Sequence, residues 1–315
     1  MNSIVNSFKR MDPVRWILLV VLVAIVAFSI GRCTAPEPPA IIESSDLAVV
    51  ERTSRTLIDR YGTKNVLVIY DLDNTLLAME QGLGSDQWYT WQKNLAGENP
   101  CHEELVADRL AVQGALYHAS AMRLTQPDAD DIVRNLQILG IPVMAITSRG
   151  PGFRLPTFRE LRRNGLDFEE SAPGPEGGYQ QLIKPQSGSR DIRYEDGVLF
   201  TAGQHKGQML AELLELTETR WPRALIIADD KMENLQNFAE TAAENDVPLY
   251  GFHYQGEAEQ VAGFDTTAAN QQWQRLWQAL LTVQQEFGPD NFQIPESQGP
   301  VDCQLVAPEA IPQAR

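Results

Sequence analysis

The sequence predicts an α/β fold with a doubly wound parallel sheet. Short apolar runs alternate along the chain with helical segments, as is typical of a parallel sheet covered by helices. Runs without polar alternation are typical of strands that are buried on both faces. The chain has 315 residues, 43% of them hydrophobic, which is enough for one large core or for a core with a smaller insertion. Four apolar runs are the candidate strands: residues 65–70, 141–146, 223–228 and 247–252.

Helical segments flank these runs at residues 46–61, 127–139 and 207–216. The stretch between the first two candidate strands is too long for a plain crossover. A small helical cap is therefore expected at about 77–124, over the ends of the strands. A later stretch rich in Gly, Pro and Ser is expected to close on a hairpin about Asp196-Gly197.

Aromatic and apolar residues between Trp273 and Phe287 recur near helical spacing. They predict a C-terminal helix that docks on the core, with a partner surface as the alternative. The catalytic domain is expected to span residues 47–287, followed by a flexible tail over 288–315.

The N-terminus carries the clearest targeting feature. Arg15 and Arg32 bound a run of 16 uncharged, mostly apolar residues, somewhat short for a bilayer crossing unless the arginines snorkel. Residues 1–33 are therefore predicted to form a transmembrane signal-anchor, with a Pro-rich linker over 34–46. The positive flank places the catalytic domain on the periplasmic side of the inner membrane. The alternative is a cleaved signal peptide and a secreted protein.

Charge and cysteine usage exclude two kinds of ligand. The net charge of -16 argues against nucleic acid, because a phosphate backbone requires a basic footprint. The three cysteines form no C-x-x-C pair, and the four histidines are scattered, so no zinc site is predicted. If the domain is exported, Cys101 and Cys303 could form a disulfide; otherwise they are two unpaired thiols.

The strongest chemical signal is the motif Asp71-Leu-Asp-Asn-Thr75, directly after the first candidate strand. Two acids one residue apart at the end of a buried strand are costly unless a cation or a catalytic task stabilises them. In an open α/β sheet, ligands bind at this edge.

Polar residues at other strand and helix ends extend this signal. Thr147-Ser148-Arg149 ends the second candidate strand, Lys206 begins a helix, and Asp229-Asp230 ends the third strand with Asn234 four residues later. Converging carboxylates repel one another strongly in a partly dry site. A hard cation with oxygen ligands relieves this repulsion, and Mg²⁺ suits the carboxylates.

These four motifs resemble those of the haloacid dehalogenase superfamily, over a core of about residues 60–255, and the resemblance implies a Rossmann-like core with a cap. The second motif also resembles that of the acid phosphatases in the superfamily. The stretch 153–168 and the hairpin region 197–206 are similar to a little-characterised bacterial branch of unknown function.

The resemblance implies a Mg²⁺-dependent phosphomonoesterase. Asp71 would be the nucleophile that forms an aspartyl-phosphate, Asp73 the general acid and base, and Lys206 the counter-charge. The cation would be held by Asp71, the Asp73 carbonyl and Asp230, with Asp229 or Asn234 in support. Four residues would bind the substrate phosphate: Asn74, Thr147, Ser148 and Arg149.

Two open points and two alternatives accompany this hypothesis. Arg149 could bind substrate or pair with a surface acid. Trp88, Tyr89 and Trp91 could stack on a substrate ring or form the core of the cap. The alternative functions are a phosphotransferase or mutase with the same nucleophile, and a catalytically idle binding module on a membrane anchor.

Overall fold

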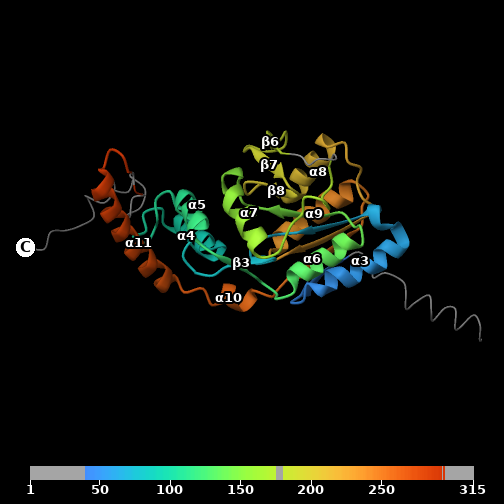
Figure 1. The fold of residues 1–315 in the computed structure, drawn as a ribbon, viewed down its shortest axis with the longest axis horizontal. Coiled ribbons are helices and arrows are strands. Elements are labelled where there is room, and N and C mark those ends of the chain that lie inside the picture. Colours follow the sequence, from blue (N-terminus) through green and yellow to red (C-terminus); the bar gives the residue numbers. More distant parts are fainter. Residues whose placement is uncertain (1–39, 175–179, 293, 295–315) are drawn as a thin grey trace, which may run out of the picture.

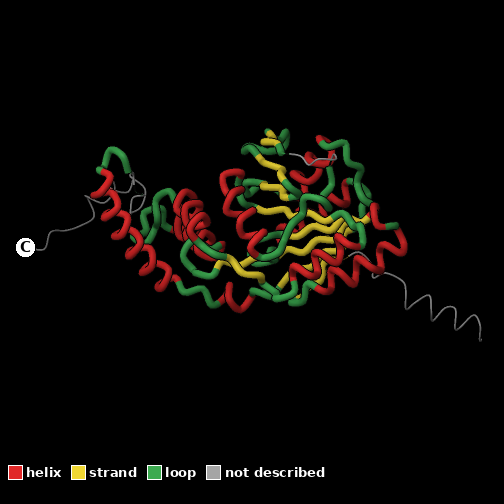
Figure 2. The backbone as a smooth tube through the Cα atoms, viewed as in Figure 1, coloured by secondary structure: helices red, strands yellow, loops and turns green. Residues whose placement is uncertain are grey.

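The computed structural model describes residues 40–174, 180–292 and 294, and it has a mixed α/β fold around a largely parallel sheet. Its first six strands in spatial order are parallel, and the last two are antiparallel to their neighbours. Figures 1 and 2 show helices on both faces of this sheet. The spatial order is β1 (Ala40–Ser44), β10 (Leu249–Tyr254), β9 (Ala224–Asp229), β2 (Val66–Tyr70), β5 (Val143–Thr147), β8 (Val198–Phe200), β7 (Ile192–Glu195) and β6 (Gln181–Ile183).

Two hydrophobic clusters lie on opposite faces of the sheet. Successive side chains of a strand point to opposite faces, so β2 supplies Val66 and Val68 to one cluster and Leu67 and Ile69 to the other. The first cluster packs α3 (Ala48–Tyr61), α6 (Ala129–Ile138) and α7 (Arg154–Arg163) onto the sheet. The second packs α8 (Lys206–Leu216) and α9 (Met232–Glu244). Short 3₁₀ turns, η1 (Thr63–Asn65) and η2 (Pro151–Phe153), precede β2 and α7.

The four predicted strands are confirmed, with ends that move by one or two residues. The hairpin is also confirmed, because β7 and β8 pair antiparallel about Asp196 and Gly197, both at positive φ. The linker expected over 34–46 is wrong in the part that the structure describes. Residues 40–44 form the edge strand β1, which pairs in parallel with β10.

Residues 77–124, here named the insert, leave the sheet after β2 and return before α6. Their ends, β3 (Leu77–Met79) and β4 (Met122–Leu124), form a two-stranded antiparallel ladder. Between these strands lie α4 (Asp86–Glu98) and α5 (Arg109–Ala119). Trp88 is fully buried and belongs to the packing of the insert, which is one of the two roles expected for its aromatic residues.

The C-terminal helix docks on the insert, and its expected position on the main core is wrong. After α10 (Ala258–Ala262), the 22-residue helix α11 (Thr266–Phe287) runs alongside α4, away from the sheet (Figure 1). Its buried Trp273 packs with Trp88 in a third cluster, separate from both sheet clusters. The aromatic pattern indicated a docked helix but not the surface that it covers.

The helices of the described residues include none with the length and apolar character needed to cross a bilayer. Residues 1–33, the predicted signal-anchor, lie outside the described residues. So does the tail beyond residue 292, except for residue 294.

Candidate active site

The first motif lies where β2 and β9 end side by side. Their register pairs Tyr70 with Ala228, and the Asp71 amide donates to the Ala228 carbonyl at 2.9 Å. The next residues of both strands, Asp71 and Asp229, therefore emerge together at the carboxyl edge of the sheet. Both are buried, at 6% and 1% exposure.

Lys206 lies between these two carboxylates. Its Nζ is 2.6 Å from Asp71 Oδ1 and 2.6 Å from Asp229 Oδ2, and the side chain is buried. Lys206 is the first residue of α8, and Gly207 beside it allows α8 to approach α9 closely. A Cβ at Gly207 would lie 2.4 Å from Thr241 Oγ1 and 2.5 Å from the Asn237 carbonyl oxygen.

The two adjacent acids after β9 have different surroundings. Asp229 accepts hydrogen bonds from Lys206, from the Lys231 amide at 2.9 Å and from Asn234 Nδ2 at 2.8 and 3.0 Å. Asp230 Oδ1 is buried and has no hydrogen-bond partner among the described residues. Asp230 is therefore the acid with an unused oxygen, whereas Asn234 holds Asp229 in place.

Asp71, Asp229 and Asp230 form a cluster whose carboxylate oxygens lie within 4.8 Å of one another. Hard oxygen donors this close suit a divalent cation such as Mg²⁺. The buried, unpartnered oxygen of Asp230 is the feature that a bound cation would satisfy. The residues present therefore fit the predicted metal.

Burial and mutual repulsion control the protonation of this cluster. Burial raises the pKa of Asp71 to about 7, with Asp229 and Asp73 adding to the rise and Lys206 opposing it. Burial and the neighbouring carboxylates Asp71 and Asp229 also raise the pKa of Asp230 well above its ordinary value. Burial alone would lower the pKa of Lys206, but the two carboxylates bonded to it raise that pKa above its usual range.

Asp73 faces a different set of partners. Arg149 donates to both of its oxygens at 2.8 Å, and the Tyr117 hydroxyl donates to Oδ1 at 2.9 Å. The Arg149 guanidinium also lies 4.5 Å from the centre of the Tyr117 ring. Burial alone would raise the pKa of Asp73, but Arg149 and Tyr117 outweigh it and lower that pKa. The partner of Arg149 is thus a motif carboxylate and not a surface acid.

The loop after β2 is tied to its surroundings through Asn74 and Thr75. Asn74 adopts a left-handed conformation, with φ 60°, and its Nδ2 lies 3.4 Å from Asp230 Oδ2. Thr75 Oγ1 accepts the Asp230 amide at 3.0 Å. From the insert, Gln87 Nε2 donates to Asn74 Oδ1 at 3.0 Å.

The second motif contributes residues of different exposure. Thr147 is fully buried and its hydroxyl accepts the Arg149 amide at 3.2 Å, whereas Ser148 is exposed. Thr147 is the last residue of β5 and Ser148 follows it. β5 is the neighbour of β2 on the side opposite β9.

Sequence reasoning missed several residues that the insert brings to this edge. Tyr117 contacts Asp73, Gln87 contacts Asn74, and Asp86 pairs with Lys231 at 2.9 Å. None of them belongs to a motif near a strand end. The expectation that the insert covers the strand ends is the one sequence signal that pointed to residues of the insert.

The match to a family model covers residues 48–287, and the family is described as "Protein of unknown function (DUF2608)". The chain belongs to this family. Its similarity to a Chlamydia pneumoniae protein named "Putative outer membrane protein" is 25% identity over 205 residues, which is 62% of this chain and 72% of the relative. These findings correct the expected membership of the haloacid dehalogenase superfamily, to which neither of them points. The motifs behind that expectation are each only a few residues long.

Proposed function

We propose that this protein is a Mg²⁺-dependent phosphohydrolase that cleaves phosphomonoesters through an aspartyl-phosphate on Asp71. The observation that carries the proposal is the buried cluster of Asp71, Asp229 and Asp230 with Lys206 bonded to two of its members. Three carboxylates and one ammonium leave a net negative charge in a desolvated site. Such an arrangement is costly without a cation or a catalytic use.

The residues present fit the two displacements of such a reaction. Asp71 would attack phosphorus, and the bond from phosphorus to the leaving oxygen would break as that oxygen takes a proton from Asp73. Water would then attack phosphorus, give its proton to Asp73 and release phosphate from Asp71. Asp71 Oδ1 is bonded to Lys206, while Oδ2 accepts no hydrogen bond from another described residue.

Asp73 is poised for the second displacement. Its lowered pKa keeps it ionised, as a base for water must be. As the acid of the first displacement it has to carry a proton, so its double hydrogen bond with Arg149 has to open. A phosphate dianion offers Arg149 another bidentate partner, so substrate binding and release of Asp73 would be linked. Arg149 would then contact the substrate, which is one of the two roles that the sequence predicted for it.

Asp71 and Asp230 would hold Mg²⁺, together with the Asp73 carbonyl, while Asp229 and Asn234 support the site. The bound ion would supply a Lewis acid that offsets charge on the transferring phosphoryl group. Lys206 would neutralise the negative charge of the carboxylates that the ion leaves uncompensated. Asn74, Thr147 and Ser148 stay candidates for contacts with phosphate oxygens.

The proposed location is the cell envelope, with the domain outside the cytoplasm. The name of the Chlamydia relative, the basic and apolar N-terminal segment and the disulfide-bonded state of Cys101 support it. Disulfides form mainly in exported proteins. Cys303 is the proposed partner of Cys101, and peptide mapping of the non-reduced protein, purified from its envelope fraction, would identify the pair.

The test of the activity is phosphate release by the full chain from p-nitrophenyl phosphate, with Mg²⁺ or with EDTA. Activity should require Mg²⁺ and should fall roughly a thousandfold or more in Asp71→Asn, which is nearly isosteric. The matched control is Asp59→Asn, an exposed acid on α3, which should keep wild-type activity. A folded wild-type protein as inactive as Asp71→Asn would favour the idle binding module instead.

A further inference from the structure

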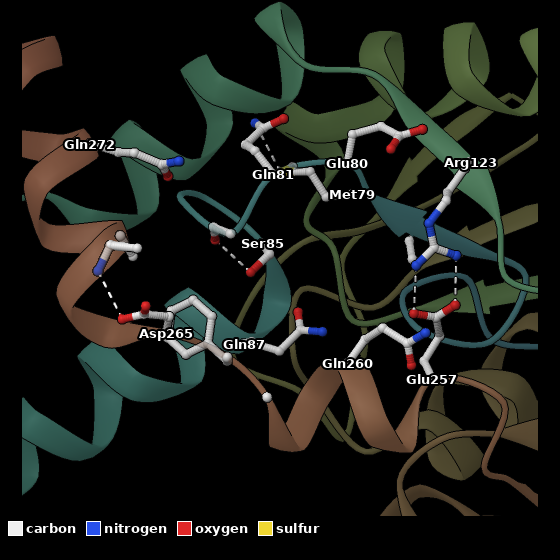
Figure 3. Close-up of a pocket in the computed structure, with 16 residues that line it drawn as sticks. Met79, Glu80, Gln81, Ser85, Gln87, Arg123, Glu257, Gln260, Asp265 and Gln272 are labelled. Carbon is white, nitrogen blue, oxygen red and sulfur yellow. Dashed lines mark hydrogen bonds and ion pairs between the residues drawn. The ribbon is translucent and has the colours of Figure 1, made fainter.

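A cavity of about 300 Å³ lies between the insert and the C-terminal helices. Figure 3 shows its two walls: β3, Arg123 of the paired strand β4 and the segment to the start of α4 supply one, and the segment from Glu257 to α11 supplies the other. This volume is at the lower end of the range for ligand sites, about 300–1,000 Å³, so it suits a small molecule.

The cavity is joined to the proposed active site through one side chain. Gln87 lines the cavity and donates to Asn74, whose amide in turn lies 3.4 Å from Asp230. The neighbouring Asp86 pairs with Lys231, next to Asp230 in sequence. A chain of two hydrogen bonds, from Gln87 to Asn74 and from Asn74 to Asp230, therefore links the cavity to the carboxylate cluster.

The lining is rich in neutral groups that both donate and accept hydrogen bonds. Four glutamines line the cavity, and the side-chain amides of Gln260 and Gln272 make no hydrogen bond to any other described residue. Each amide offers two donors and an acceptor, a set that suits hydroxyl groups. The Phe264 ring, tilted against Trp91 at 6.2 Å, adds an aromatic surface.

The charges of the lining disfavour a second anionic group. Arg123 is the one cation among the residues that line the cavity. Its guanidinium is already paired, because it donates to both carboxylate oxygens of Glu257 at 2.7 and 2.8 Å. Glu80 and Asp265 add negative charge, both at exposed positions. A leaving group with its own phosphate or carboxylate would find no free cation there.

We infer that this cavity receives the leaving group of the substrate and that this group is neutral and polyhydroxylated, as in a sugar monophosphate. The inference rests on the proposed phosphohydrolase function and specifies its substrate class. The phosphate would lie at the carboxylate cluster and the hydroxyls would bond to the free amides. The aromatic face of Phe264 would contact the C–H face of the ring.

Binding is measured by titration calorimetry on the full chain carrying Asp71→Asn, in Mg²⁺, so that no turnover occurs. The probes are glucose 6-phosphate, adenosine 5′-monophosphate and phosphocholine. Glucose 6-phosphate should bind tightest. Adding Gln272→Leu or Gln260→Leu should weaken its binding by about three- to tenfold each, the loss expected for one hydrogen bond. Gln271→Leu, on the exposed side of the same helix, is the matched control.

Turnover of p-nitrophenyl phosphate separates this inference from the function on which it rests. If that ester is hydrolysed but adenosine monophosphate or phosphocholine binds tightest, the inference is overturned and the phosphohydrolase stands. Equal loss with Gln272→Leu and Gln271→Leu also overturns it. If no ester is hydrolysed, the proposed function fails, but selective binding of glucose 6-phosphate that Gln272→Leu weakens would still support the sugar cavity.

Discussion

Lys206 Nζ lies 2.6 Å from Asp71 Oδ1, although the two residues are 135 positions apart in the chain. The contact joins the residue after β2 to the start of α8. Lys206 Nζ also lies 2.6 Å from Oδ2 of Asp229, at the end of β9. All three side chains are buried, so the pairing is a fixed part of the core at the sheet edge.

Removing the ammonium should destabilise the protein strongly. Lys206→Met would leave Asp71 and Asp229 buried without their counter-charge, and loss of one partner from a buried pair costs about 3–5 kcal/mol. Urea unfolding in EDTA at pH 7 would measure the change, with Lys64→Met, an exposed lysine, as the control. A loss below about 1 kcal/mol would mean that Lys206 is not the counter-charge described here.

The fold could be predicted from the sequence where a local pattern determines it. The four strands predicted from the sequence, β2, β5, β9 and β10, are mainly apolar, and the hairpin has a turn signal at Asp196-Gly197. The edge strand β1 was missed because Pro-rich sequence precedes it and its own side chains are mostly exposed. Its place depends on pairing with β10, more than 200 residues away, which no local pattern reveals.

The sequence predicts which acidic residues form the site but not how their side chains are arranged. Strand ends placed Asp71, Asp229 and Asp230 at one edge, because parallel strands end together. Among the described residues, both oxygens of Asp229 accept hydrogen bonds, whereas Oδ1 of Asp230 has no partner. The sequence of two adjacent acids does not reveal this difference, which depends on side-chain contacts. Tyr117 comes from α5 of the insert, so its contact with Asp73 depends on how the insert folds back.

Metal-free protein should lose stability as the pH rises from about 4 to 7. Burial raises the pKa of Asp71 from 3.8 to about 7, so within this window the folded state binds a proton that the unfolded chain has released. Asp230 acts in the same direction. Carboxylates with lowered pKa values, such as Asp73, destabilise the fold only at lower pH, when they become protonated.

Urea unfolding in EDTA at pH 5, 6, 7 and 8 would check this pH dependence. Mg²⁺ should reverse the trend, because it binds the deprotonated carboxylates and stabilises the folded state by mass action. In Asp71→Asn the loss between pH 5 and 7 should shrink. Wild-type protein that is more stable at pH 7 than at pH 5 without metal would contradict the raised pKa of Asp71.

Tyr117 should position Asp73 rather than react. Tyr117→Phe removes the hydrogen bond of 2.9 Å and keeps the ring next to Arg149, so stability should fall by only about 1 kcal/mol. The pKa of Asp73 should rise, because the hydroxyl helps to lower it, and the acid limb of the pH–rate profile should move to higher pH. The control is Tyr194→Phe on β7, which β8 separates from β5. It removes a buried hydroxyl that donates to the Pro173 carbonyl at 2.6 Å. An unchanged acid limb in Tyr117→Phe would show that the Tyr117 hydroxyl does not control the pKa of Asp73.

Trp273 should hold α11 on the insert and so maintain the cavity between them. Trp273→Ala removes a side chain that is 1% exposed from the cluster with Trp88, and truncating a buried tryptophan costs about 3–5 kcal/mol. This cluster is separate from the two that flank the sheet, so the sheet should keep its fold while α11 loosens. Hydrogen exchange should show faster exchange in α11 and α4 and unchanged protection in β2 and β9. Phe287→Ala, at a 63% exposed position of the same helix, should leave both unchanged. Loss of protection in β2 as well would show that the insert, α11 and the sheet unfold as one unit.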